Sequence, residues 1–194
     1  MNYAIPPILG GEHGATLLDK LSPITCQKII GLHNTSPKLK GRVQIKEGHL
    51  SEDYKVIDHI RQVDTFIINH TEEWIDQLLI EYAMKANERY FGYNLAGLIE
   101  RPQLLKYESP SVGYTWHVDL GNGDASNRKL SMSIILNSNF EGGELHFFSE
   151  GDIPFPTSQG DIVVFSSFIP HCVTRVSEGT RWALVAWFSG PQFR

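Results

Sequence analysis

Hydrophobic and polar positions follow two different spacings, and the change from one to the other falls near residue 99. Between Thr71 and Tyr90 apolar side chains recur every 3.6 residues, which predicts a long amphipathic helix. The apolar positions of this helix are Trp74, Ile75, Leu78, Leu79, Tyr82 and Ala83. One face of such a helix must cover an apolar surface, and the strands that follow it are the candidates.

The segment before this helix carries weaker signals. A shorter helix is predicted from Ser22, as the N-cap, and Pro23, as the first helical residue, to about His33. The other expected features are an irregular segment over residues 1–21, a short strand over 42–46 and a strand over 63–69. Together with the long helix, these elements make residues 1–98 a helical support and a substrate-side segment.

After residue 99 short apolar runs alternate with turns rich in glycine, proline and polar residues. The predicted strands cover residues 104–107, 114–120, 130–137, 144–149, 161–168, 171–176 and 180–189. Short strands after a helical half predict an α+β protein with a mainly β core, in which a jelly roll carries the N-terminal helices on one sheet. No linker is evident, so residues 1–194 are expected to form one domain with its jelly-roll core over 99–190.

The last predicted strand is apolar on both faces. Arg181, Ala183, Val185 and Trp187 share one face, and the residues between them share the other. A strand with this pattern is buried on both sides. We expect one face to meet the helices and the other to line a cavity that contains Arg181.

Composition narrows the class of protein. Its 194 residues are 41% hydrophobic, which is enough for a sizeable core. A net charge of −5 and a pI near 5.9 disfavour nucleic acid or an anionic membrane as a partner. Cys26 and Cys172 are the only cysteines, which fits a reducing compartment. Residues 1–7 do not resemble a signal peptide, and no segment is apolar enough to span a bilayer, so a cytoplasmic location is expected.

Two histidines and one aspartate form the strongest candidate for chemistry. His117 and Asp119 are two residues apart on a predicted strand, so their side chains point to the same face. His171 belongs to another strand-like run. Two imidazoles and a carboxylate make a facial triad, which holds iron(II) and leaves coordination positions open. A catalytic zinc would accept the same three ligands.

Competing arrangements have less support. His146 and Glu144 form a second His/carboxylate pair, but no further ligand accompanies them at suggestive spacing. The sequence contains neither the His-Glu-x-x-His signature of zinc hydrolases nor the Gly-x-Ser-x-Gly elbow of serine hydrolases. Arg181 follows His171 by ten residues and could clamp a carboxylate with its planar guanidinium.

Several short motifs occur together in the second half of the chain. They are Leu105-Lys106-Tyr107, Tyr114-Thr115-Trp116-His117-Val118-Asp119, Arg128-Lys129-Leu130-Ser131, Glu141-Gly142-Gly143-Glu144-Leu145, Gly160-Asp161-Ile162-Val163-Val164-Phe165, Pro170-His171, Arg181 and Trp187. Over roughly residues 99–190 this ensemble resembles the iron(II)/2-oxoglutarate-dependent dioxygenases, most closely the prolyl 4-hydroxylase branch. The resemblance rests on the combination of motifs and not on any one of them.

The resemblance implies a role for each motif residue. His117, Asp119 and His171 would bind iron(II), and 2-oxoglutarate would chelate the iron through its 1-carboxylate and 2-oxo groups. Arg181 would pair with the distal carboxylate, where prolyl hydroxylases more commonly have lysine. The remaining assignments are Tyr107 and Ser131 beside the co-substrate, with Trp187 and Tyr114 in the pocket wall. For Tyr107, Ser131 and Trp187, simple core packing is the alternative.

The implied reaction consumes O2 and 2-oxoglutarate, releases succinate and CO2, and hydroxylates an unactivated C–H bond, with ascorbate as a supporting reductant. The first candidate substrate is a peptidyl proline, and a free amino acid or other small molecule is the second. Loops 109–113 and 121–127 and the segment 42–61, including Arg61, are candidates for the substrate mouth.

Two further classes remain as alternatives. Nucleic-acid demethylases of this superfamily carry a second arginine six residues after the first, where this chain has Trp187. A catalytically silent, metal-binding module is the other alternative. The oligomeric state is not readable from the sequence.

The separation of His171 and Arg181 makes a geometric prediction. In a simple hairpin, Arg181 would lie about five residues from His171, on the order of 16 Å at roughly 3.3 Å per residue. A five-carbon diacid on the metal could not reach so far. We therefore expect the chain to cross between two facing sheets here, as a double-stranded β-helix requires.

Overall fold

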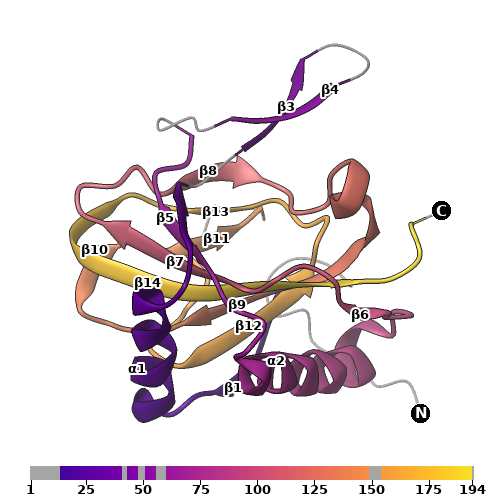
Figure 1. The fold of residues 1–194 in the computed structure, drawn as a ribbon, viewed down its shortest axis with the longest axis horizontal. Helices are drawn as coiled ribbons and strands as arrows, with labels where there is room; N and C mark the ends of the chain where they lie inside the picture. Colours follow the sequence, from indigo (N-terminus) through magenta and orange to yellow (C-terminus); the bar gives the residue numbers. More distant parts are fainter. Residues whose placement is uncertain (1–13, 41–42, 48–50, 56–59, 149–153, 194) are drawn as a thin grey trace.

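Two antiparallel sheets face each other in the structure, a computed structural model that describes residues 14–40, 43–47, 51–55, 60–148 and 154–193 (Figure 1). The large sheet has the strand order β1-β12-β9-β14-β7-β5-β2, and β6 and β10 also pair with β14. Its strands are β1 (Thr16–Lys20), β2 (Lys38–Lys40), β5 (Asp64–Ile67), β6 (Gly97–Leu98), β7 (Gln103–Glu108), β9 (Arg128–Ile135), β10 (Phe140–Gly142), β12 (Asp161–Ser166) and β14 (Val176–Ser189).

The small sheet has the order β11-β13-β8. Its strands are β8 (Tyr114–His117), β11 (Leu145–Phe147) and β13 (His171–Val173). Apolar side chains of both sheets form the core between them, including Tyr107 and Phe165 from the large sheet and Phe147 from the small one. A separate pair, β3 (Val43–Glu47) and β4 (Ser51–Lys55), projects above this jelly roll (Figure 1).

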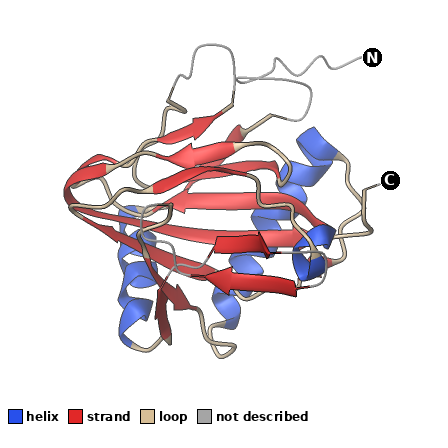
Figure 2. Cartoon of the chain, turned by 90° about the horizontal axis from the view of Figure 1, so that it is seen from above, coloured by secondary structure: helices blue, strands red, loops and turns tan. Residues whose placement is uncertain are grey.

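The helices pack on the outer face of the large sheet, as predicted (Figures 1 and 2). Helix α1 (Pro23–Gly31) starts at the expected cap, because the Ser22 hydroxyl accepts a hydrogen bond of 3.1 Å from the Thr25 amide. Helix α2 (Glu73–Ala86) buries Ile75, Leu79, Ala83 and Ala86 against the sheet. Short 3-10 turns occupy Leu32–Asn34 and Gly123–Asn127.

Strand β14 confirms the prediction of a strand buried on both faces. Leu184, Ala186 and Phe188 contact the helices in the outer core. Arg181 and Trp187 lie on the opposite face and line a cavity between the sheets. The predicted crossing is also confirmed, because His171 lies in the small sheet and Arg181 in the large one.

Three local predictions were wrong, each for residues whose hydrogen bonds involve other parts of the chain. The expected turn at 177–179 is part of β14, since β10 pairs with it from Phe140↔Gly179 to Gly142↔Val176. The expected irregular segment includes β1, which pairs with β12. The strand predicted over 114–120 ends at His117, because the amides of Asp119 and Leu120 both donate to the Ser167 carbonyl.

The long helix also differs from its prediction at both ends. It begins at Glu73, with Glu72 as an N-cap whose side chain makes no capping hydrogen bond. It changes at Asn87 into a π-helical turn (Asn87–Phe91) that ends at Gly92 with φ +67°, a left-handed conformation that favours glycine. Residues 1–13 of the expected irregular segment lie outside the described residues, as does residue 149 at the end of the strand predicted over 144–149. Among the described helices, none combines the length and apolarity needed to cross a membrane.

Candidate metal centre

The three predicted ligands converge at one end of the small sheet. His117 ends β8 and His171 begins β13, and the two residues are direct partners in the antiparallel ladder. Asp119 lies just beyond β8. Its Oδ1 is 3.7 Å from Nε2 of His117, and its Oδ2 is 3.6 Å from Nε2 of His171. The three ligand atoms lie within 4.8 Å of one another, and no second group of this kind occurs among the described residues.

Backbone carbonyls orient both imidazoles. Nδ1 of His117 lies 2.7 Å from the Thr115 carbonyl, and Nδ1 of His171 lies 3.0 Å from the Ile169 carbonyl. If each Nδ1 carries the proton and donates it to its carbonyl, each Nε2 keeps a lone pair directed toward Asp119. This is the tautomer that a metal ligand requires.

Burial and neighbouring charges favour the ligand forms of these side chains. Burial, followed by the adjacent imidazole of His171, lowers the pKa of His117 to about 3. For Asp119 burial would raise the pKa, but the two imidazoles, a hydrogen bond from Ser131 and the Arg128 guanidinium together hold that pKa below its ordinary value. A neutral His117 imidazole and an ionised Asp119 carboxylate are therefore the forms present near neutral pH.

We expect the free energy of unfolding of the metal-free protein to fall between pH 7 and pH 5. The unfolded chain takes up a proton on His117 near the ordinary pKa of 6.5, whereas the buried imidazole stays neutral down to about 3. Because only the unfolded state takes up this proton, stability is lost as the pH falls through 6.5. Urea unfolding should show a smaller pH dependence in His117→Gln than in the exposed control His70→Gln. Equal dependence in the two variants would contradict the lowered pKa.

An inner cavity of about 50 Å³ adjoins the triad on the inside of the jelly roll. His117, Asp119 and His171 line it together with Arg181. Arg181 is only 2% exposed, and its Nε has no hydrogen-bond partner. Its guanidinium lies 5.5 Å from the centre of the Tyr107 ring and forms no ion pair with the described residues.

A buried cation without an acid is costly, so this cavity fits an anion. Burial lowers the pKa of Arg181, but a guanidinium stays charged in proteins. Gly143 leaves room for this side chain, because a Cβ there would lie 2.7 Å from Cδ of Arg181. A carboxylate is the group that best matches the planar donor fork of arginine.

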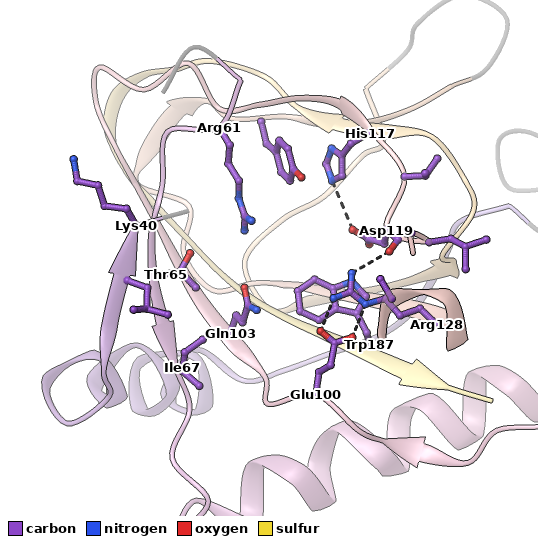
Figure 3. A pocket seen from close by; sticks show the side chains of 16 residues that line it. Lys40, Arg61, Thr65, Ile67, Glu100, Gln103, His117, Asp119, Arg128 and Trp187 are labelled. Carbon is purple, nitrogen blue, oxygen red and sulfur yellow. Dashed lines mark hydrogen bonds and ion pairs between the residues drawn. The ribbon is translucent and has the colours of Figure 1, made fainter. Parts of the chain in front are cut away.

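An outer cleft of about 410 Å³ borders the same triad (Figure 3). His117 and Asp119 line both the cleft and the inner cavity. The opposite wall comes from the large sheet and includes Thr65, Gln103 and Trp187. A group bound in the cleft would therefore lie beside the triad without entering the inner cavity.

The other predicted site residues differ in whether they line the cavities or contact the ligands. Tyr107 lines the inner cavity beside Arg181, and Trp187 lines both cavities. The Tyr114 ring stacks on His117 with 3.5 Å between ring centroids, and burial raises the pKa of Tyr114 to about 12. Ser131 does not line the inner cavity; its hydroxyl hydrogen-bonds to Asp119 and lies 3.0 Å from the Ser167 hydroxyl.

Other candidates of the sequence lie elsewhere. His146 lies 3.4 Å from Glu144 and faces Cys172 across β11 and β13, outside the triad. Within the proposed mouth segment 42–61, the only side chains described are those of the last two residues, and Arg61 lines the cleft. Lys40, which immediately precedes this segment, lines the cleft as well.

One ion pair at the site was not predicted. Arg128 donates from Nη1 to the Asp119 carbonyl at 3.0 Å, and its guanidinium lies 4.2 Å from the centre of the Trp187 ring. The same guanidinium forms a two-point ion pair with Glu100, with Nε 2.5 Å from Oε1 (Figure 3). Arg128 stands in one of the motifs of the sequence, but nothing local connects it to Glu100.

We expect Arg128→Met to weaken metal binding by about 10–100-fold, the usual effect of losing a partner that orients a ligand. The variant removes both the hydrogen bond to the Asp119 backbone and a positive charge that favours the Asp119 carboxylate. Titration with Co(II) would measure the affinity. Arg101→Met is a matched control, since Arg101 also makes an ion pair and carbonyl hydrogen bonds, but with Asp76 and Ile68. Equal metal affinity in the two variants would remove Arg128 from the centre.

Comparisons with known proteins agree with this geometry. The family model described as the 2OG-Fe(II) oxygenase superfamily matches residues 102–189. A PKHD-type hydroxylase of Synechococcus sp. (strain CC9902) is 37% identical over 141 residues, which cover 70% of this chain and 61% of that protein. A PKHD-type hydroxylase of Idiomarina loihiensis is 34% identical over 92 residues, covering 46% of this chain and 42% of that protein. The chain thus spans less than two thirds of these relatives.

Solved structures share the fold. A prolyl-4-hydroxylase of Pseudomonas putida superposes with a TM-score of 0.70 at 18% identity, covering 92% of this chain and 94% of that one. A prolyl hydroxylase of Trichoplax adhaerens, in complex with a peptide fragment of the hypoxia inducible factor oxygen degradation domain, gives 0.71 at 18% identity, covering 91% and 84%. The predicted double-stranded β-helix is confirmed.

Proposed function

We propose that this chain, whose residues 102–189 match the 2OG-Fe(II) oxygenase superfamily, is an iron(II)- and 2-oxoglutarate-dependent dioxygenase that hydroxylates an unactivated C–H bond. One observation carries the proposal: the buried cation Arg181 borders the same cavity as the triad. A zinc hydrolase would use the same three ligands but would leave this guanidinium without a function.

The donor set fits the metal and the cavity fits the co-substrate. His117, Asp119 and His171 supply two nitrogens and one carboxylate, the facial set typical of non-haem iron(II). The iron centre, when bound, supplies the oxidising chemistry, in which O2 and 2-oxoglutarate give succinate, CO2 and a hydroxylated product. Arg181 would hold the distal carboxylate of 2-oxoglutarate through two parallel hydrogen bonds.

Other side chains position groups and exclude water. Tyr107 packs beside the Arg181 guanidinium, and apolar residues such as Leu145 and Val173 complete the inner cavity. Tyr114 remains protonated near neutral pH, with a pKa of about 12, and holds the His117 ring by stacking. Trp187 forms the wall between co-substrate and substrate, since it lines both the cavity and the cleft.

A peptidyl proline is the first candidate substrate. The outer cleft shares Lys40 and Arg61 with a second groove of about 400 Å³, so together they exceed the space that one amino acid needs. The solved relative from Trichoplax adhaerens carries a peptide. In this proposal residues 1–194 act as one domain, in which residues 1–98 support the sheet and supply one wall of the cleft. A free amino acid or another small molecule is the alternative.

The test is an assay of the purified protein with iron(II), 2-oxoglutarate and ascorbate against prolyl peptides, free amino acids and an alkylated oligonucleotide. We expect succinate release coupled to the gain of one oxygen atom by a peptide, detected by mass spectrometry. Oxidation of free amino acids only would select the alternative substrate class. A protein that binds iron but never releases succinate above the rate of its His171→Ala variant would contradict the proposal and favour a silent module.

A further inference from the structure

Two cations mark the point where the outer cleft and the second groove meet. Lys40, on the edge strand β2, and Arg61 line both of these spaces. Arg61 also lines the inner cavity. Figure 3 shows Lys40 at one edge of the cleft and the Arg61 side chain extending into it.

The position of Arg61 is tied to the metal centre. Its backbone forms a β-bridge with Tyr114, and its guanidinium lies 4.7 Å from the centre of the Tyr114 ring. The same Tyr114 ring stacks on His117, with 3.5 Å between ring centroids. A series of three side chains thus places the guanidinium at a set distance from a triad ligand.

The described carboxylates that line the cleft and groove are already engaged by other groups. Glu100 pairs with Arg128, and Asp119 lies between the two imidazoles. Asp64 pairs with Lys38 at 2.8 Å, and Glu108 pairs with Lys106 at 2.9 Å. Lys40 makes no ion pair with any residue in the described part of the chain. Lys40 therefore contributes a positive charge to the junction that no described carboxylate offsets, next to the Arg61 guanidinium.

We propose that Lys40 and Arg61 form a recognition site for a carboxylate of the substrate, next to the residue that is hydroxylated. This inference rests on the proposed function and specifies its substrate class as an anionic one. Arginine matches a carboxylate with a planar donor fork, while lysine adds a point charge on a flexible stem. The carboxylate could be a chain terminus or an acidic side chain that follows the hydroxylated residue.

The test measures binding without turnover, on the full-length protein loaded with iron(II) and 2-oxoglutarate in the absence of oxygen. The probes are N-acetyl-Pro-Gly with a free carboxylate, N-acetyl-Pro-Glu-amide and the neutral N-acetyl-Pro-Gln-amide. We expect at least one acidic probe to bind about tenfold more tightly than the neutral one. This preference should shrink when the salt concentration is raised to about 0.5 M. The acidic probe that shows the preference identifies the source of the carboxylate.

Variants of Lys40 and Arg61 test whether these two cations cause the preference for the acidic probe. Lys40→Gln and Arg61→Gln should each remove most of it, and Arg61→Lys should restore part of what Arg61→Gln loses. Lys106→Gln is the matched control, because it removes one positive charge from the same groove but leaves the junction unchanged. The control should retain the preference.

Equal binding of the three probes, no measurable binding of either acidic probe, or equal loss of preference in Lys106→Gln would each overturn the carboxylate site. Affinity for 2-oxoglutarate is measured separately in every variant. A wild-type protein that does not bind 2-oxoglutarate would contradict the proposed function itself. A protein that binds 2-oxoglutarate but treats the three probes alike would overturn only the inference drawn from Lys40 and Arg61.

Discussion

The Arg181→Met variant is expected to be more stable than the wild-type protein without ligands, yet to bind 2-oxoglutarate at least roughly 30-fold more weakly. Methionine fills much of the same volume and removes a buried charge that has no ion pair with the described residues. The gain in unfolding free energy should be on the order of 1–3 kcal/mol. Urea unfolding of the metal-free protein and calorimetric titration with 2-oxoglutarate would measure the two effects.

Arg101→Met separates this expectation from a general effect of losing an arginine. Arg101 pairs with Asp76 at 2.5 Å and donates to backbone carbonyls on the outer side of the large sheet. Its loss should destabilise the protein and leave the affinity for 2-oxoglutarate unchanged. If Arg181→Met destabilised the protein to the same extent and kept its affinity, Arg181 would be a structural residue.

The second large effect is expected for His171→Ala, which should lower the affinity for iron(II) by more than about 100-fold. Loss of a ligand should cost more affinity than loss of a residue that only orients a ligand, which costs about 10–100-fold. Alanine removes one of the three ligand atoms that lie within 4.8 Å of one another. The fold should persist, because β13 keeps its pairing on both sides through backbone hydrogen bonds. Anaerobic titration with iron(II), together with circular dichroism, would measure binding and folding.

His146→Ala is the matched control for this variant. His146 stands on the neighbouring strand β11, and its side chain is 9% exposed, against 8% for His171. It lies outside the triad and should retain full metal affinity. If both variants lost iron equally, the effect would come from the sheet and not from a ligand.

Local periodicity predicted most of the secondary structure and, within the site, which side chains of one strand share a face. The 3.6-residue repeat of α2 and the alternation along β14 depend on neighbouring residues only, so they are readable in the chain. The same alternation placed Arg181 and Trp187 on one face. The spacing of His117 and Asp119 suggested a shared face, although the strand ends at His117 and a turn brings Asp119 back to the metal side.

The features that escaped prediction depend on contacts between distant residues. Arg128 and Glu100 are 28 positions apart and meet only because their segments flank the same cleft. Strand β1 owes its conformation to β12, and the expected turn at 177–179 is extended by β10. Hydrogen bonds between strands come from partners that no local pattern identifies.

The sequence by itself determined which chemical groups are available, namely two imidazoles, one carboxylate and a guanidinium. It also indicated which residues of the last strand share a face with the guanidinium. The tertiary structure alone decided that His171 and Arg181 lie on opposite sheets and border one cavity, and that Arg61 stands beside Tyr114 at the mouth. The physical reason is that residue type and alternation are local properties. The distance between two side chains is set by how the sheets pair and stack.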